Sequence, residues 1–411
     1  MLALCCAVVS LITIVSFIFG PTRSHAAALQ GTAIVGAKVY ASPDEAPIED
    51  ALILIRSGRI EAVAPRSSTA IPAGYQVINA RGRVATAGFW NSHVHLTTPV
   101  LIRAVDTSDA ALQEELERVF TRWGFTTVFD LASTTPIANE VLRRIETGRV
   151  KGPRLLSVGE PFYPTGATPI YARPFYKAFN LASAEITSDA DAVRRVEEQV
   201  RAGADGIKLF TGSIIGERDV VYMPASSIAA LSSSARALGK RVFAHPTDRR
   251  GLELAVRNGA SILAHSAPLM GSWSPRYARW LAKRRIALIP TLSLFEAEPH
   301  PSTPVTVAVQ QTAALYRAGG SILFGTDAGF TEVFDTSAEV RLLNDAVGWK
   351  GVLASLTTAP AAVFGETTTR GKVRRGFVAD IVLLGGDPAD DVQKIRDVRM
   401  VIKDGQTILA R

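Results

Sequence analysis

Cysteine is nearly absent from this sequence, and charge of one sign is never concentrated in one part of it. The only cysteines among the 411 residues are Cys5 and Cys6, so the rest of the chain contains no thiol for a disulfide framework or for nucleophilic catalysis. The 45 basic and 38 acidic residues are spread out, and the formal net charge is +7. A chain without a basic patch and interleaved aromatic residues is not expected to bind nucleic acid.

The longest hydrophobic run lies at the N-terminus. Residues 2–19 are almost continuously apolar and are followed by Gly20-Pro21 and by a small-residue segment that ends at Ala26. This pattern predicts a secretory signal peptide over residues 1–26, cleaved after Ala26. A retained N-terminal anchor is the alternative, because the run comes close to the length of a membrane span. We expect cleavage, which predicts a secreted or periplasmic protein without stable membrane association.

From residue 84 onward, short apolar runs alternate with amphipathic segments of helix length. Eight such runs predict an α/β fold in which residues 84–365 form a (β/α)₈ TIM barrel. The expected strands are 84–95, 126–132, 154–162, 206–211, 241–245, 261–266, 286–293 and 321–327. A doubly wound open sheet is the alternative, but no glycine-rich dinucleotide loop follows the first strand.

The segments on either side of the predicted barrel resemble each other in pattern. Residues 27–83 and 366–411 both contain short strand-like runs with turn residues between them, and Asp404-Gly405 is a strong hairpin signal. Two β-rich ends that flank a barrel most simply pair with each other. We therefore predict one small β-sandwich domain built from the N- and C-terminal segments.

Histidine is scarce, and four of the six histidines end apolar, strand-like runs. His93 and His95 face the same side of a strand, because side chains two residues apart do so. His245, His265 and Asp327 end three later runs. A barrel of this type places its chemistry at the carboxyl ends of its strands. A single buried histidine is usually a satisfied core residue, but this convergence favours a divalent metal site.

Lys208 alternates with Ile207 and Leu209, so it is expected to face the barrel interior. A buried ammonium is costly, and a desolvated lysine loses its proton easily. The neutral amine could take up CO₂ to form a carbamate that bridges two metal ions. The alternative is an ion pair with Asp130 or Asp327. The predicted ligands of one metal ion, or of two if the lysine is carbamylated, are His93, His95, Lys208, His245, His265 and Asp327.

These residues, in this order, resemble the amidohydrolase superfamily, most closely its imidazolonepropionase-like branch. Residues 88–95 look like the first-strand signature of that family, and residues 376–383 look like its closing β-domain motif. The resemblance covers nearly the whole chain after residue 26. It implies a distorted (β/α)₈ barrel, a composite β-sandwich and one or two divalent metals, usually zinc.

The sequence departs from the family pattern in two places. Asn91 stands where the family commonly has an Asp, so a carboxylate beside the ligands is missing. Residues 159–164 lack the glycine-rich histidine motif of some dipeptidase members. Imidazolonepropionases bind one metal and lack the bridging lysine, so Lys208 argues against that particular activity.

The expected function is metal-dependent hydrolysis of a C–N bond in a small molecule, such as a non-peptide amide, lactam or imide. A bound metal lowers the pKa of water and polarises the scissile carbonyl, and Asp327 would act as the general base that delivers a proton to the leaving nitrogen. His265 is either a ligand of the second metal or a donor to the developing oxyanion. A metallo-dipeptidase, an esterase or lactonase, and a non-catalytic binding barrel are the alternatives. If Asp327 were structural, Glu160 and Glu296 would be the next candidate bases.

The small-molecule substrate is expected to contact the long segment 162–180, a candidate lid. Its proposed contacts are Tyr163, Tyr171, Arg173 and Tyr176, with Arg173 or Arg103 holding a substrate carboxylate in a bidentate pair. The alternative is that these aromatic residues only pack the loop onto the barrel rim. Assembly into a homo-oligomer remains open.

Overall fold

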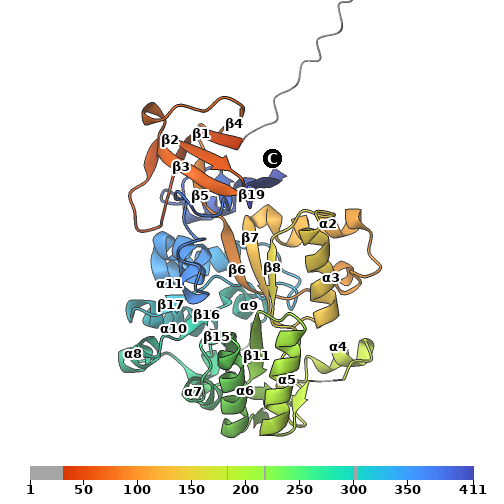
Figure 1. The fold of residues 1–411 in the computed structure, drawn as a ribbon. Coiled ribbons are helices and arrows are strands. Elements are labelled where there is room, and N and C mark those ends of the chain that lie inside the picture. The colour runs from red at the N-terminus through yellow and green to blue at the C-terminus, as the bar shows by residue number, and fades with distance from the viewer. Residues whose placement is uncertain (1–30, 183, 217–218, 300–303) are drawn as a thin grey trace, which may run out of the picture.

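The computed structural model describes residues 31–182, 184–216, 219–299 and 304–411 (Figure 1). The predicted signal peptide, residues 1–26, therefore lies outside the described residues. Within the described ranges, no helix is both long enough and apolar enough to cross a membrane.

Eight parallel strands form the central barrel, in two hydrogen-bonded sheets of three and five strands. The first sheet contains β6 (Phe89–Val94), β7 (Phe125–Asp130) and β8 (Arg154–Ser157). The second contains β11 (Gly206–Phe210), β14 (Arg241–His245), β15 (Ile262–Ala264), β16 (Ala287–Ile289) and β17 (Ser321–Ile322).

Backbone hydrogen bonds close both gaps between the two sheets. The Phe162 N–H donates to the Lys208 carbonyl at 2.9 Å, and the Phe210 N–H donates to the Phe162 carbonyl at 2.9 Å. On the other side, the Ser92 N–H donates to the Phe324 carbonyl at 2.7 Å. The result is the predicted TIM-barrel-type fold of mixed α/β content.

A long helix follows each barrel strand in the described part of the chain and packs on the outside of the ring. In α7, for example, the buried residues Leu252, Ala255 and Val256 lie three and four positions apart, which makes one apolar face. Side chains at the N-caps of four of these helices accept backbone N–H bonds of the first turn. The helices are α2 (Asp109–Val119), α3 (Thr135–Glu146), α5 (Asp189–Arg201), α6 (Ala225–Ala237), α7 (Arg249–Arg257), α8 (Pro275–Lys283), α10 (Val305–Arg317) and α11 (Ser337–Leu356).

Shorter elements lie mostly in the loops between strands and helices. The short helices are α1 (Pro99–Ile102), α4 (Arg173–Ala178), α9 (Leu292–Ala297) and α12 (Thr358–Val363). Two short strand pairs are formed by β9 (Tyr163–Pro164) with β10 (Glu185–Ile186) and by β12 (Gly212–Ile214) with β13 (Val220–Tyr222). Of these, α4, α9 and β9 border the candidate site.

The two ends of the chain meet in one eight-stranded sheet, at the upper end of the molecule in Figure 1. Its strands are β1 (Gly31–Val39), β2 (Ile48–Arg56), β3 (Arg59–Pro65), β4 (Tyr75–Asn79), β5 (Val84–Ala87), β18 (Ile381–Leu384), β19 (Val398–Lys403) and β20 (Gln406–Ala410). The hairpin prediction at Asp404-Gly405 is confirmed: Lys403 pairs with Gln406, and both turn residues have positive φ. The pairing of the two ends in one β structure agrees with the prediction from their patterns.

The strand expected over residues 84–95 is two strands, and this prediction was wrong. β5 pairs with β1 and β18 in the terminal sheet, whereas β6 pairs with β7 in the barrel. The change occurs at Gly88, where an added Cβ would lie 2.2 Å from Thr126 Oγ1. Only glycine permits this close approach of two chain segments.

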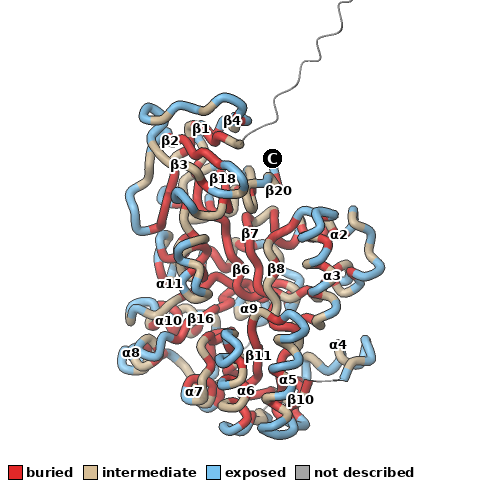
Figure 2. Tube along the Cα trace, in the orientation of Figure 1, coloured by how far each residue is buried: buried red, intermediate tan, exposed pale blue. Residues whose placement is uncertain are grey.

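The core fills the barrel and continues under the helices, as the buried strands in Figure 2 show. At one end of the ring, Phe129, Phe243 and Phe364 contact one another with ring centroids 4.8–6.2 Å apart. The predicted strand runs at β8, β16 and β17 continue four or five residues beyond the observed strands. Each of these extensions contains a residue with left-handed backbone: Gly159 with φ 71°, Thr291 with φ 46° and Asp327 with φ 57°.

Candidate active site

The six predicted ligand residues line one cavity of about 470 Å³ at the carboxyl ends of the barrel strands. His93 lies on β6, Lys208 on β11, and His245 is the last residue of β14. His95 and His265 directly follow β6 and β15, and Asp327 lies five residues after the end of β17. The fold therefore brings together side chains that are as much as 234 positions apart in the sequence (327 − 93).

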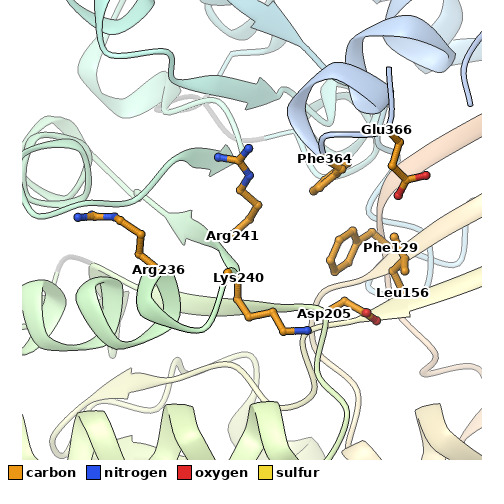
Figure 3. Close-up of a pocket in the computed structure, with 9 residues that line it drawn as sticks. Phe129, Leu156, Asp205, Arg236, Lys240, Arg241, Phe364 and Glu366 are labelled. Carbon is orange, nitrogen blue, oxygen red and sulfur yellow. The ribbon is translucent and has the colours of Figure 1, made fainter. Parts of the chain in front are cut away.

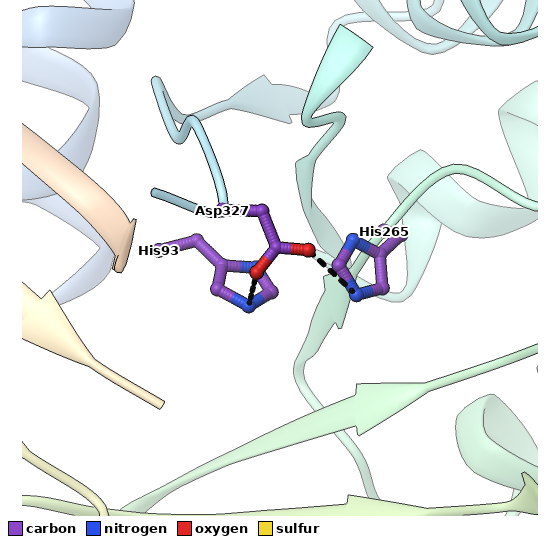
Figure 4. Close-up of side chains that lie close together, drawn as sticks. All are labelled: His93, His265 and Asp327. Atoms are coloured by element: carbon purple, nitrogen blue, oxygen red, sulfur yellow. Dashed lines mark ion pairs between the residues drawn. The ribbon is translucent and has the colours of Figure 1, made fainter. Parts of the chain in front are cut away.

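Asp327 stands between the histidines (Figure 4). Its Oδ1 lies 2.6 Å from His95 Nε2 and 3.2 Å from His93 Nε2, and its Oδ2 lies 3.7 Å from His265 Nε2. His245 completes the group, with its ring centroid 5.0 Å from that of His265. The backbone of Asp327 is left-handed, with φ 57°. Apart from glycine, Asn and Asp are the residues that adopt this conformation most readily.

Burial sets the protonation states of the cluster. It lowers the pKa of His93 and of His245 to about 3, and it lowers that of His265 well below its ordinary value. Burial alone would raise the pKa of the Asp327 carboxyl, but His93, His265 and His95 outweigh it and hold that pKa well below its usual range. Near neutral pH the site thus presents an ionised carboxylate beside neutral imidazole rings.

This donor set fits a divalent metal ion. One nitrogen each of His93 and His265 and one Asp327 oxygen lie within 4.8 Å of one another. Within the described ranges, the buried Nδ1 atoms of His93 and His95 form no hydrogen bond. Buried polar atoms without partners are rare, and neutral imidazole with carboxylate is a common ligand combination for zinc. The group could therefore hold a metal ion.

Lys208 is almost fully buried, as its alternation with Ile207 and Leu209 predicted. Burial lowers the pKa of its ammonium to about 8, although Asp327 opposes the shift. The Nζ of Lys208 donates to the Ala264 carbonyl at 3.5 Å. In the described ranges its Nζ forms no ion pair with Asp130 or Asp327. A larger fraction of this lysine is thus in the neutral amine form, which carbamylation requires, than of an exposed lysine.

Asn91 connects the strand of His93 to the turn of Asp327. Its Oδ1 accepts the N–H groups of His93 at 3.2 Å and Thr326 at 3.3 Å, and its Nδ2 donates to Thr326 Oγ1 at 2.8 Å. An amide can donate and accept at once, which a carboxylate cannot do. At this position Asn91 therefore links β6, which carries His93, to the turn that carries Asp327.

The outer wall of the cavity is aromatic. Tyr163, Tyr171 and Tyr176, which were predicted to contact the substrate, all line it. Sequence reasoning missed Phe210 and Phe330, which lie among the same wall residues. Phe210 is two positions after Lys208 on β11, so the strand alternation already put it on the same face. Phe330 packs edge-on against Tyr171 at 5.5 Å between ring centroids.

The prediction that Arg173 or Arg103 faces the substrate was wrong. Arg173 is exposed, and its Nε donates to the Thr168 carbonyl at 3.0 Å. It is the first residue of α4, and its guanidinium contacts the segment before that helix. Arg103 is also exposed, and neither arginine lies among the described residues that line the cavity.

Glu160 and Glu296, the alternative bases, do not line the cavity either. Glu296 is paired instead with Arg341. Within the described part of the chain, Asp327 is the one carboxylate on the cavity wall.

Comparisons with known proteins agree with this geometry. A family model described as the amidohydrolase family matches residues 84–408. The chain is 24% identical over 310 residues to an ochratoxinase from Aspergillus niger, and the match covers 68% of this chain and 63% of that protein. It thus spans less than two thirds of the length of this curated relative.

Two solved structures share the fold over most of the chain. A putative prolidase from Bifidobacterium longum is 22% identical, with a TM-score of 0.77, and the match covers 92% of this chain and 95% of that one. The A. niger ochratoxinase is 19% identical, with a TM-score of 0.76, and the match covers 93% and 96%. At such low identities these two matches show a common fold and no more.

Proposed function

Because the chain belongs to the amidohydrolase family, as its motifs predicted, we propose that it is a metal-dependent hydrolase. Its reaction would be cleavage of a non-peptide C–N bond in a small amide, lactam or imide. The observation that carries the proposal is the single cavity carboxylate, Asp327, held ionised among histidines at the bottom of an aromatic pocket.

The proposed metal ligands are the six residues that meet at the cavity: His93, His95, Lys208, His245, His265 and Asp327. They would hold one divalent ion, or two if Lys208 is carbamylated, and zinc suits the imidazole and carboxylate donors. When bound, the metal lowers the pKa of water and polarises the substrate carbonyl.

Asp327 moves the proton in this proposal. Its ionised carboxylate accepts a proton from the attacking water and delivers it to the leaving nitrogen, which departs as a neutral amine. Oδ1 and Oδ2 face different histidines, so one oxygen can keep its contact while the other carries the proton. His265, whose burial keeps it neutral, either joins the ligand set or donates to the developing oxyanion.

The wall of the cavity favours an apolar or aromatic substrate group. Tyr163, Tyr176 and Phe210 form a continuous aromatic surface, with ring centroids 4.9 Å and 6.0 Å apart. Lys208 is the one lysine or arginine among the described residues of the wall. A dipeptidase would need an ion partner for the free carboxylate of its substrate. The aromatic wall therefore supports a non-peptide amide over a dipeptide.

A hydrolysis screen of the metal-loaded protein tests the proposal. The panel holds N-aroyl amides, cyclic amides and imides, dipeptides and lactones, and Asp327→Asn serves as the inactive control. We expect cleavage of one of the non-peptide amides at a higher kcat/KM than any dipeptide or lactone. A clear preference for dipeptides would support the metallo-dipeptidase instead, and a preference for lactones would support the esterase or lactonase.

We also propose that the protein acts outside the cytoplasm, as a secreted or periplasmic enzyme. The apolar residues 2–19 and the small residues before Ala27 support this location. N-terminal sequencing of the protein recovered from a bacterial host should find Ala27 as the first residue. A chain that still begins at Met1 and sediments with membranes would favour the retained anchor.

A further inference from the structure

A glutamate that the proposed reaction does not use lies fully buried behind the site. Glu339, in the first turn of α11, has no exposed surface, and α11 packs against α9. Its Oε2 accepts the backbone N–H of Ser293 at 2.6 Å, across 46 residues of sequence. It thereby satisfies an N–H group in the first turn of α9, which has no side-chain cap of its own.

The residue at the N-cap position of α9 is Thr291, but its hydroxyl is hydrogen-bonded to another side chain and does not cap the helix. Thr291 Oγ1 lies 2.8 Å from His265 Nδ1, and Thr291 is itself completely buried. Its backbone is left-handed, with φ 46° and ψ 53°. This conformation is unfavourable for a β-branched residue, so the surrounding structure must hold it in place.

We propose that Glu339 is a positioning residue for His265: it holds the first turn of α9, which fixes Thr291, whose hydroxyl sets the orientation and tautomer of the His265 ring. The inference rests on the proposed function for its consequence in catalysis. With Nδ1–H donated to Thr291, the Nε2 lone pair faces Asp327 and the metal ligands.

Packing alone does not explain a carboxylate at this position. Burial raises the pKa of Glu339 to about 7, opposed by its backbone hydrogen bonds, so the group is costly to keep there. Its Oε1 has no hydrogen-bond partner among the residues that the structure describes. An apolar residue would fill the space without these costs but would leave the α9 backbone uncapped.

Histidine ¹⁵N NMR on the metal-free protein tests the positioning directly, because the chain has only six histidines. The His265 signals are assigned with His265→Gln. We expect His265 to carry its proton on Nδ1 in the unaltered protein. Glu339→Ala and Thr291→Val should convert it to a mixture of tautomers, whereas Glu339→Gln and Thr291→Ser, which keep an acceptor and a hydroxyl, should restore most of the original signal.

The matched control is Glu115→Gln, which alters a buried glutamate on α2 that is paired with Arg118. It should leave the His265 signals unchanged at a similar loss of thermal stability. With a hydrolysed substrate in hand, Glu339→Ala should lower kcat by about 10- to 100-fold, the usual effect of removing support behind a ligand, with KM within about twofold.

The outcomes separate the two proposals. Unchanged His265 signals in Glu339→Ala, or equal changes in Glu115→Gln, would overturn the positioning role whatever the activity. Altered signals that Glu339→Gln restores, in a protein that hydrolyses nothing in the panel, would support the positioning role and overturn the proposed function.

Discussion

The barrel carries a cavity at each end, and the two differ in how their charged groups are arranged. At the carboxyl ends of the strands, about 470 Å³ are lined by four histidines, one lysine, one carboxylate and an aromatic wall. The second cavity, of about 340 Å³, lies where β14 begins and is lined by Arg236, Lys240, Arg241, Asp205 and Glu366 around Phe129 and Phe364 (Figure 3). The same strands therefore end in two different kinds of surface.

The acidic groups of the second cavity already have partners. Glu366 pairs with Arg154 at 3.0 Å, and Asp205 accepts the Ser157 N–H at 3.0 Å. Arg236 and Arg241 are exposed to solvent, where a charge costs little. At the other end, ionisable groups are buried and crowd one another, and the pKa values of Lys208, Asp327 and three of the four histidines are shifted. Perturbed groups that converge on a cavity point to function more strongly than cavity size does.

The largest expected effect is that of Asp327→Asn, which removes the proton acceptor but keeps an oxygen near the ligands. Turnover should fall on the order of a hundredfold or more, while most of the metal stays bound. Because the ionised form of Asp327 is lost as pH falls through its lowered pKa, the acidic limb of the pH–rate profile should vanish or move in the variant. Near-normal turnover with an intact acidic limb would show that Asp327 is structural.

Lys208→Met should have the next largest effect. Methionine fills similar space but cannot form a carbamate. Elemental analysis of protein expressed with zinc and bicarbonate should give close to two metal ions for the unaltered chain and one for the variant. The turnover of the variant should fall by about tenfold at most. A stoichiometry of one in both proteins would reduce the ligand set to His93, His95, His245 and Asp327.

A smaller effect is expected at the aromatic wall. Phe210→Ala removes a ring that lies against Tyr163 and stacks on His245 at 4.4 Å. An aromatic contact of this kind contributes about 0.5–1.5 kcal/mol, so KM for an aromatic amide should rise roughly two- to tenfold. Phe210→Leu is the matched apolar control. Equal KM values for aromatic and aliphatic amides in both variants would contradict a role of the wall in substrate choice.

The smallest effect is expected at the opposite end of the barrel. Arg241→Ala alters an exposed residue of the second cavity, so kcat/KM should stay within about twofold and the free energy of unfolding within about 0.5 kcal/mol. Urea denaturation and the same activity assay provide both numbers. A large loss of activity with normal stability would mean that the two ends of the barrel are coupled, and the contrast between them would fail.

Most of the barrel and of the cluster could be predicted from local patterns in the sequence. The strand alternation placed His93, His95 and Lys208 on inward faces, and the alternation of apolar runs with helices gave the order of the barrel elements. The break of residues 84–95 into two strands could not be foreseen, because it depends on the contact of Gly88 with Thr126 across the fold. The direction of Arg173 was equally hidden, since it follows from where α4 begins.

The sequence by itself determined which residues end strands and which face they share, because side-chain direction in a strand repeats every two residues. It therefore indicated which side chains could meet at one rim of the barrel before any contact was known. Only the tertiary structure decided what stands behind those ligands. His265, Thr291 and Glu339 come from three separate segments, which meet because α11 packs against α9 and because the Thr291 side chain bonds to His265. Contacts between distant segments depend on packing over the whole chain, so the local periodicity of the sequence does not predict them.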